Sequence, residues 1–128
     1  MNARRDGFTL IELLIVVVII GILASIAIPK WSAVRERAYL ASIKSDLKNL
    51  ATLQDVYHNG NYTYSTSFAD LDFGTSEGII LLIGDAAGTG WSASATHQGL
   101  PDEVCAMYHG GSSPVAPATV ESVIMCTR

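Results

Sequence analysis

The chain has 128 residues, of which 49% are hydrophobic and only 16% are charged, and its formal net charge is −4. A soluble domain usually carries about a quarter charged residues, so this composition excludes a disordered chain and a strongly charged nucleic-acid binder. It also indicates that part of the chain sits outside water. At this length we expect a single folded domain.

Charge is distributed unevenly along the chain. Seven of the eight basic residues lie at or before Lys48, and only Arg128 follows. Residues 49–128 contain eight acidic residues and one basic residue, which gives a formal charge of −7. A surface that follows a phosphate backbone needs clustered Lys or Arg. We therefore expect no direct nucleic-acid site in this part.

The first element is an apolar segment, Phe8–Ile28, whose 21 residues contain one charged side chain, Glu12. As a helix it would be about 31 Å long, the thickness of the hydrocarbon core of a bilayer. Arg4 and Arg5 precede it and favour a cytoplasmic N-terminus. A cleaved signal peptide is the alternative, with a small-residue site at residues 25–27. Glu12 argues against it, because an acid in a disposable apolar segment costs energy and gains nothing.

The stretch from Gly7 to Pro29, GFTLIELLIVVVIIGILASIAIP, resembles the N-terminal signature of type IV pilins and pseudopilins. The resemblance implies that a prepilin peptidase removes the leader, residues 1–7, after Gly7. It also implies that the new terminal residue, Phe8, is N-methylated. Residues 8–30 would then be held by inner-membrane lipid, with a periplasmic head formed by residues 31–128. The pilus assembly machinery would finally polymerise subunits into a helical homopolymer on the cell surface.

Glu12 has a specific role in this family, in which the acid is thought to meet the terminal amine of a neighbouring subunit. A lone carboxylate in an apolar medium is costly, whereas a paired one is tolerable. We therefore expect Glu12 to penalise wrong subunit register during assembly. The alternative is that Glu12 only reaches towards the membrane interface.

Gly21 and Pro29 suggest local loosening of the helix. Proline removes a backbone donor and clashes with the carbonyl four residues earlier, so we expect a kink or local melting at Pro29. Gly21 weakens a helix by about 1 kcal/mol relative to alanine. Close helix packing is an equally good explanation of Gly21.

Beyond Pro29 the helix becomes amphipathic. The apolar stripe consists of Leu40, Ile43, Leu47, Leu50, Leu53 and Tyr57, and this spacing is typical of one helix face. Arg37, Lys44, Lys48 and Asp55 lie off the stripe and should be solvated or lie between subunits. We expect the helix to end near His58, because residues 59–61 read Asn-Gly-Asn.

The remainder predicts a small antiparallel sheet, so the fold class is α+β, matching the type IV pilin fold that the resemblance implies. Residues 59–78 should connect helix and sheet, anchored by Tyr62, Tyr64, Phe68, Leu71 and Phe73. About four strands are expected, with residues 84–90 as a loop and residues 98–102 as a turn. The expected strands are Ile79–Ile83, buried on both faces, a half-buried strand from Trp91, Val104–Tyr108, and Val120–Cys126.

Cys105 and Cys126 lie in the last two expected strands. Two cysteines in an exported domain most simply form one disulfide. Such a bridge would stabilise the Gly/Ser/Pro-rich loop between them by about 3 kcal/mol. The family commonly has a C-terminal disulfide loop on the filament surface.

No catalytic or cofactor-binding pattern stands out. Residues 84–90 are glycine-rich, but no lysine follows them, so a nucleotide site is not expected. Asp70, Asp72 and Glu77 could ligate calcium, although their spacing is not that of an EF-hand. We expect no metal, no cofactor and no enzymatic activity.

The sequence thus favours a structural subunit of a type IV pilus, acting in adhesion, twitching motility or DNA uptake. The first alternative is a pseudopilin of a type II secretion system, which shares the N-terminus. The second is a membrane-anchored binding module.

Overall fold

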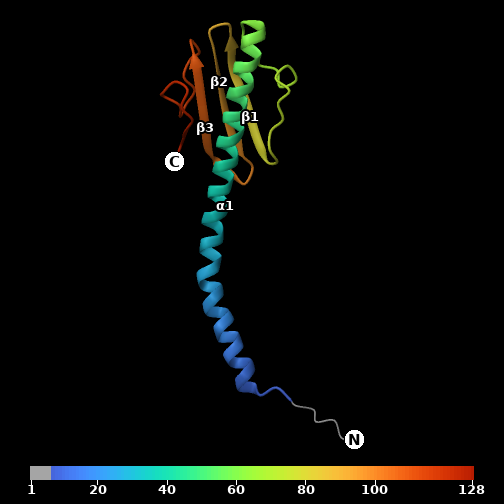
Figure 1. Cartoon of the computed structure of the whole chain (residues 1–128). Coiled ribbons are helices and arrows are strands. Elements are labelled where there is room, and N and C mark those ends of the chain that lie inside the picture. The colour runs from blue at the N-terminus through green and yellow to red at the C-terminus, as the bar shows by residue number, and fades with distance from the viewer. Residues whose placement is uncertain (1–6) are drawn as a thin grey trace, which may run out of the picture. The chain divides into compact units, whose positions relative to one another are not determined.

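The computed structural model describes residues 7–128, and the expected leader residues 1–6 lie outside them. One helix, α1 (Leu10–Asn61), is followed by four strands, β1 (Ile79–Ala87), β2 (Gly90–His97), β3 (Leu100–Gly110) and β4 (Met125–Cys126). The chain divides into two compact units, residues 1–35 and residues 36–128, and α1 runs through both. We call the second the C-terminal unit. These elements confirm the α+β fold (Figure 1).

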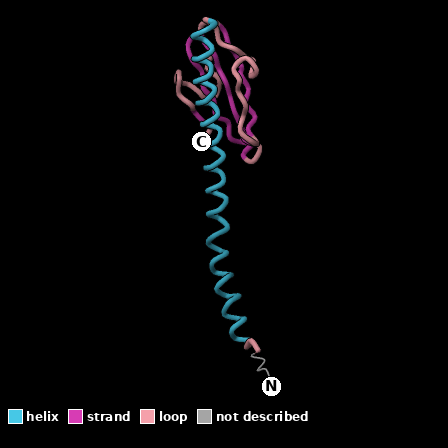
Figure 2. The backbone as a smooth tube through the Cα atoms, turned by 45° about the vertical axis from the view of Figure 1, so that its right-hand side comes forward, coloured by secondary structure: helices cyan, strands magenta, loops and turns pink. Residues whose placement is uncertain are grey.

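The C-terminal unit is an antiparallel sheet in the order β1-β2-β3-β4, covered on one face by the second half of α1 (Figures 1 and 2). Its core contains the middle of the expected helix stripe, Ile43, Leu47 and Leu50, all fully buried. Leu40, Leu53 and Tyr57 pack at the edge of that core. The expected amphipathic stripe is thereby confirmed.

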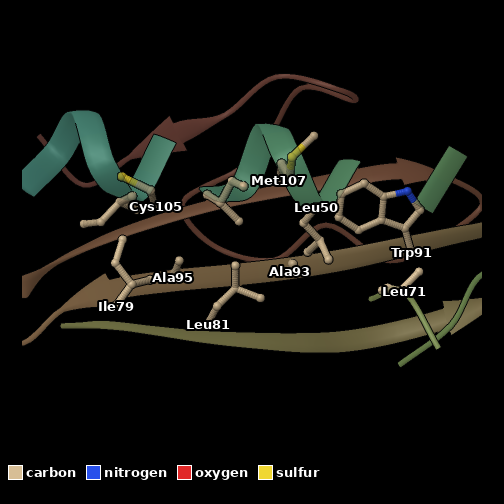
Figure 3. Packing of buried hydrophobic residues seen from close by; sticks show 11 residues of the cluster. Leu50, Leu71, Ile79, Leu81, Trp91, Ala93, Ala95, Cys105 and Met107 are labelled. Atoms are coloured by element: carbon tan, nitrogen blue, oxygen red, sulfur yellow. The ribbon is translucent and has the colours of Figure 1, made fainter. Parts of the chain in front are cut away.

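The opposing side of the core comes from the sheet and from Leu71 of the connecting loop, which we define as residues 62–78. Trp91, Ala93 and Ala95 alternate along β2 and lie in the core, as do Cys105 and Met107 of the adjoining strand β3 (Figure 3). The strand is less exposed than expected, because Ser92 is also buried, at 1% exposure. Small alanines in the central strand allow the helix to approach closely. Tyr62, expected to anchor the loop, is instead 82% exposed.

The helix ends three residues later than expected, at Asn61. The Asn61 side-chain amide donates to the Tyr57 carbonyl at 3.0 Å, and the Tyr62 N–H donates to the His58 carbonyl at 2.8 Å. Tyr62 has a φ of 54°. The left-handed residue that terminates the helix is therefore Tyr62 and not Gly60, because these two bonds satisfy the last carbonyls.

Strand β1 corrects two expectations. It is not buried on both faces, because Ile80 is 51% and Leu82 is 64% exposed while Ile79 and Leu81 are buried. It also continues through the expected loop to Ala87, since a bulge between Ile83 and Asp85 absorbs the extra residue Gly84. The turn that follows is only two residues long, Gly88 and Thr89.

Two other boundaries differ from expectation. The turn between β2 and β3 is confined to Gln98 and Gly99, so Pro101 and Asp102 belong to β3. The last strand contains only two residues, because residues 121–122 form a turn, in which Ser122 has a φ of 60°, and strand begins only at Met125. Val120 and Val123 are accordingly 53% and 45% exposed.

Candidate functional site: the N-terminal assembly segment

The expected cleavage junction lies in solvent-exposed backbone that precedes the helix. Residues 7–9 precede the helix, and Phe8 is 80% exposed. The helix begins only at Leu10, so the bond between Gly7 and Phe8 lies outside it. The geometry around Gly7 and Phe8 is therefore compatible with cleavage between them.

Thr9 and Glu12 form a capping box at the start of α1. The Thr9 N–H and the Thr9 hydroxyl both donate to Oε2 of Glu12 at 2.8 Å. In return the Glu12 N–H donates to the Thr9 hydroxyl oxygen at 3.3 Å. The reciprocal bonds satisfy N–H groups that have no partner within the helix.

Sequence reasoning missed the role of Thr9. The signal was available, because threonine followed three residues later by glutamate, just before an apolar run, is the capping-box pattern. The role expected for Glu12 was a bond to the terminal amine of a neighbouring subunit, and not a bond to Thr9 of the same subunit. Within one subunit, the Glu12 carboxylate already has a local partner, Thr9, at the start of the helix.

The carboxylate of Glu12 keeps an unused acceptor. All its side-chain bonds use Oε2, and among the described residues Oε1 accepts none. No cation of residues 7–128 forms an ion pair with it. An unpaired charge is costly in an apolar environment, so this site is chemically suited to receive a positive group from outside the subunit.

The rest of the segment is an apolar surface without cover in this chain. Every side chain of residues 7–35 is exposed except that of Ala24, which is half-buried. Among the described residues, α1 is the one helix long and apolar enough to cross a membrane. The exposed large apolar side chains include Leu13, Val17 and Ile20. Such a surface is stable only against lipid or other protein.

Gly21 and Pro29 both lie inside an unbroken helix. The local melting expected at Pro29 is absent, since helix continues on both sides of it. A Cβ atom added at Gly21 would meet nothing within 4 Å. No contact in the described part of this chain therefore requires glycine at that position, so loosening of the helix and packing against a neighbouring helix both stay as predictions for Gly21.

Cys105 and Cys126 form a disulfide that links β3 to β4, with a Cα–Cα distance of 4.0 Å. Their pairing lies in register with the neighbouring Ala106–Met125 pair. Beyond β4, the C-terminal residue Arg128 contacts Glu36 of α1 at 3.1 Å and Glu103 of β3 at 3.8 Å. The disulfide and these ion pairs hold the end of the chain against the C-terminal unit.

The candidate calcium ligands do not converge. The Asp70 carboxylate accepts a hydrogen bond from the Ser65 hydroxyl at 3.1 Å, and the Asp70 N–H donates to the Ser67 hydroxyl oxygen at 3.3 Å. Within residues 7–128 no group of three or more His, Cys, Asp or Glu side chains could hold a metal ion. Hard cations need several converging oxygens, so the described geometry offers no such site at Asp70, Asp72 and Glu77.

Comparison with known proteins identifies the same N-terminal region. Residues 2–28 match the family described as the prokaryotic N-terminal methylation motif. The chain is 43% identical over 77 residues to the type IV major pilin protein PilA of Myxococcus xanthus, covering 60% of this chain and 35% of that protein. It is 43% identical over 70 residues to the type IV wide pilus major component PilA4 of Thermus thermophilus, covering 55% and 52%.

A second group of relatives belongs to another machine. The type II secretion system core protein G of Pseudomonas aeruginosa is 36% identical over 69 residues, covering 54% of this chain and 49% of that protein. The chain thus spans between about a third and a half of the length of these curated relatives. In its N-terminal motif and in roughly its first half, the chain is therefore similar to both type IV pilins and type II secretion pseudopilins.

Proposed function

We propose that this chain is a structural subunit of a type IV pilus. Its mature form would begin at Phe8, with N-methylation of that residue. Residues 8–30 would wait in the inner membrane while residues 31–128 lie in the periplasm. Assembly would then pack residues 8–30 of many copies into the core of a surface filament that serves adhesion, motility or DNA uptake.

The observation that carries this proposal is the apolar, uncovered helix surface with one carboxylate at its start. A plain membrane anchor has no use for an acid among its apolar residues. Among the described residues, Oε1 of Glu12 accepts no hydrogen bond, so a neighbour's terminal amine could bind there. Packing of apolar side chains against copies supplies contact area, and the acid penalises subunits in the wrong register.

A pseudopilin of a type II secretion system remains the second candidate, because several relatives carry that name. The Cys105–Cys126 disulfide favours the pilin, as does the scattered arrangement of Asp70, Asp72 and Glu77. In both cases the chain would be a structural polymer subunit.

The test compares cells that lack the chain with cells that express it at native level. Filaments sheared from the surface are detected with an antibody against the C-terminal unit and imaged by electron microscopy. The pilus proposal expects surface filaments that contain the chain, with normal secretion of exoproteins in the deletion strain. Loss of secretion without loss of long surface filaments would favour the pseudopilin.

A Glu12→Gln variant separates the polymer role from plain anchoring. It keeps the size of the side chain but removes its charge, so it should enter the membrane normally and yield few filaments. Asp102→Asn, an exposed acid of β3, is the matched control and should assemble as wild type. Normal filament yield from Glu12→Gln would remove the pairing role of Glu12.

A further inference from the structure

Three cations form a stripe along the exposed face of α1 in the C-terminal unit. Arg37, Lys44 and Lys48 follow each other at intervals of seven and four residues. Since a helix turns about 100° per residue, these side chains lie within about 40° of one another around its axis. All three are exposed, and no ion pair between described residues includes them. We call this set the basic stripe.

The connecting loop carries the opposite charge. Asp70, Asp72 and Glu77 are its three charged residues, and all are exposed. The loop therefore has a formal charge of −3 against +3 on the basic stripe. None of its acids forms an ion pair with a described cation.

The loop is anchored at Ser76, on the side of α1 opposite the basic stripe. Asp46 fixes the loop, because its carboxylate accepts hydrogen bonds from the Ser76 N–H at 2.7 Å and from the Ser76 hydroxyl at 2.8 Å. Lys44 and Lys48 are each two residues from Asp46, which places both about 160° away from it around the helix. Figure 1 shows the loop to one side of α1, beside β1.

We propose that the basic stripe of one copy binds the connecting loop of a neighbouring copy. The inference rests on the proposed function, whose neighbour it names. No ion pair joins the stripe and the loop within the described part of one subunit, and copies that stand side by side in the same orientation can bring the two surfaces together. Contacts between two different surfaces of identical subunits are heterologous, and they generate rings or open helical filaments.

The charge distribution of the chain favours a second copy as the occupant. Arg128, the only basic residue after Lys48, is already engaged by Glu36 and Glu103. Adjacent C-terminal units would therefore repel each other through their acids. The three positive charges of the basic stripe match the three negative charges of the connecting loop, so they can offset this repulsion between neighbouring copies.

We expect this contact to determine how neighbouring subunits are oriented more than how tightly they bind. Exposed ion pairs are individually weak and are screened by salt. Complementary charges instead select the partner's orientation and register, and like charges in the same place are strongly disfavoured. Reversing one side should therefore disturb assembly, and reversing both sides should restore it.

The experiment uses the full chain in its own cells, with sheared surface filaments quantified by immunoblot. Lys44→Glu with Lys48→Glu should lower filament yield about tenfold, and Asp72→Lys with Glu77→Lys should do the same, because each change places like charges together. All four substitutions combined should return the yield to within about twofold of wild type. The matched control combines Lys44→Glu and Lys48→Glu with Asp85→Lys and Asp102→Lys, which restores the same net charge outside the loop and should not rescue assembly.

Membrane levels of each variant and its disulfide state establish that the subunit is folded and available. Equal rescue by the control pair, or no rescue by the loop pair, would overturn the inference and indicate a general charge effect or another ligand, such as anionic lipid headgroups. A normal filament yield from the Lys44→Glu, Lys48→Glu variant would also overturn the inference, but it would leave the proposed function intact. Absence of wild-type filaments would instead overturn the proposed function.

A second measurement does not depend on folding of a variant. Wild-type filaments grown from isotopically labelled and unlabelled copies are treated with a carbodiimide, which joins a lysine amine to a contacting carboxylate as an amide with loss of water. Mixed-label peptides joining Lys44 or Lys48 to Asp70, Asp72 or Glu77 are the expected product. Cross-links from these lysines only to other acids, or only within one copy, would contradict the inference.

Discussion

Gln54 is the buried polar residue of α1 whose replacement tests the packing of the connecting loop most sharply. Its side chain is fully buried, and its amide bonds the backbone of Ser65 twice. Nε2 donates to the Ser65 carbonyl at 2.6 Å, and Oε1 accepts from the Ser65 N–H at 3.0 Å. Ser65 is itself only 7% exposed, so water has little access to either group. This pair fixes the start of the loop to the helix.

The change Gln54→Leu keeps the side chain's approximate volume and removes both bonds. Each buried backbone group left unpaired costs about 1–3 kcal/mol, and the added apolar burial offsets part of this. We expect the free energy of unfolding to fall by about 3 kcal/mol. For a unit of this size, 1 kcal/mol corresponds to about 4–8 °C in Tm. The melting temperature should therefore fall by about 12 °C or more.

The assay follows the fluorescence of Trp91, which is 1% exposed in the core, during thermal unfolding of the full chain in detergent. Trp31 is 70% exposed and is replaced by phenylalanine in every variant, so that Trp91 alone reports. Gln98→Leu is the matched control, because Gln98 is exposed and should change stability by less than about 0.5 kcal/mol. A Gln54→Leu variant that melts within about 3 °C of the control would refute the reasoning.

Three further changes have defined outcomes. Leu50→Ala opens a cavity between α1 and the sheet and should lower the free energy of unfolding by about 2–5 kcal/mol in the same assay, whereas Val56→Ala on the exposed face should not. Thr9→Val removes the hydroxyl of the capping box, so amide exchange at the start of α1 in micelles should accelerate, and Thr9→Ser should not show this; equal exchange in both would contradict the cap. The pKa of Tyr64 is raised, first by burial and second by the Asp55 carboxylate. The contribution of neutral Tyr64 to stability is therefore complete below the ordinary pKa of a phenol and is lost as the pH rises through the pKa of the folded state. Tyr64→Phe should reduce the fall in the free energy of unfolding at alkaline pH. A pH profile of stability equal to that of wild type would contradict this prediction.

The apolar pattern predicted the helix and its buried face because these depend on spacing alone. Ile43, Leu47 and Leu50 recur at helical intervals, and any sheet that covers them buries them. The alternation of Trp91, Ala93 and Ala95 predicted β2 for the same reason. These features follow from one segment's own periodicity.

The sequence did not predict features that depend on residues far away along the chain. Asp46 and Gln54 are buried although polar, because residues 76 and 65 of the loop supply their hydrogen bonds. Strand β1 continues past Gly84 because a bulge is possible when β2 is beside it. Tyr62 ends the helix through its own left-handed backbone, although Gly60 carried the stronger local signal.

The N-terminal segment was predictable in kind but not in local detail. Its length, its apolar composition and its single acid indicated a membrane segment with an assembly role. The capping bonds between Thr9 and Glu12 needed the recognition of a four-residue pattern. The helix also continues through Pro29, because a proline inside a helix can be tolerated when the surrounding turns remain paired.

The most direct test of the central claim is the intact mass and N-terminal sequence of the chain purified from its own cells. The prepilin pathway predicts a chain that begins at N-methylated Phe8, retains the Cys105–Cys126 disulfide and is therefore lighter by two hydrogens than the reduced form. A chain that begins at Ile28, after the small-residue site at residues 25–27, would be an ordinary secreted domain. That result would remove residues 8–27 from the mature protein and contradict the filament account.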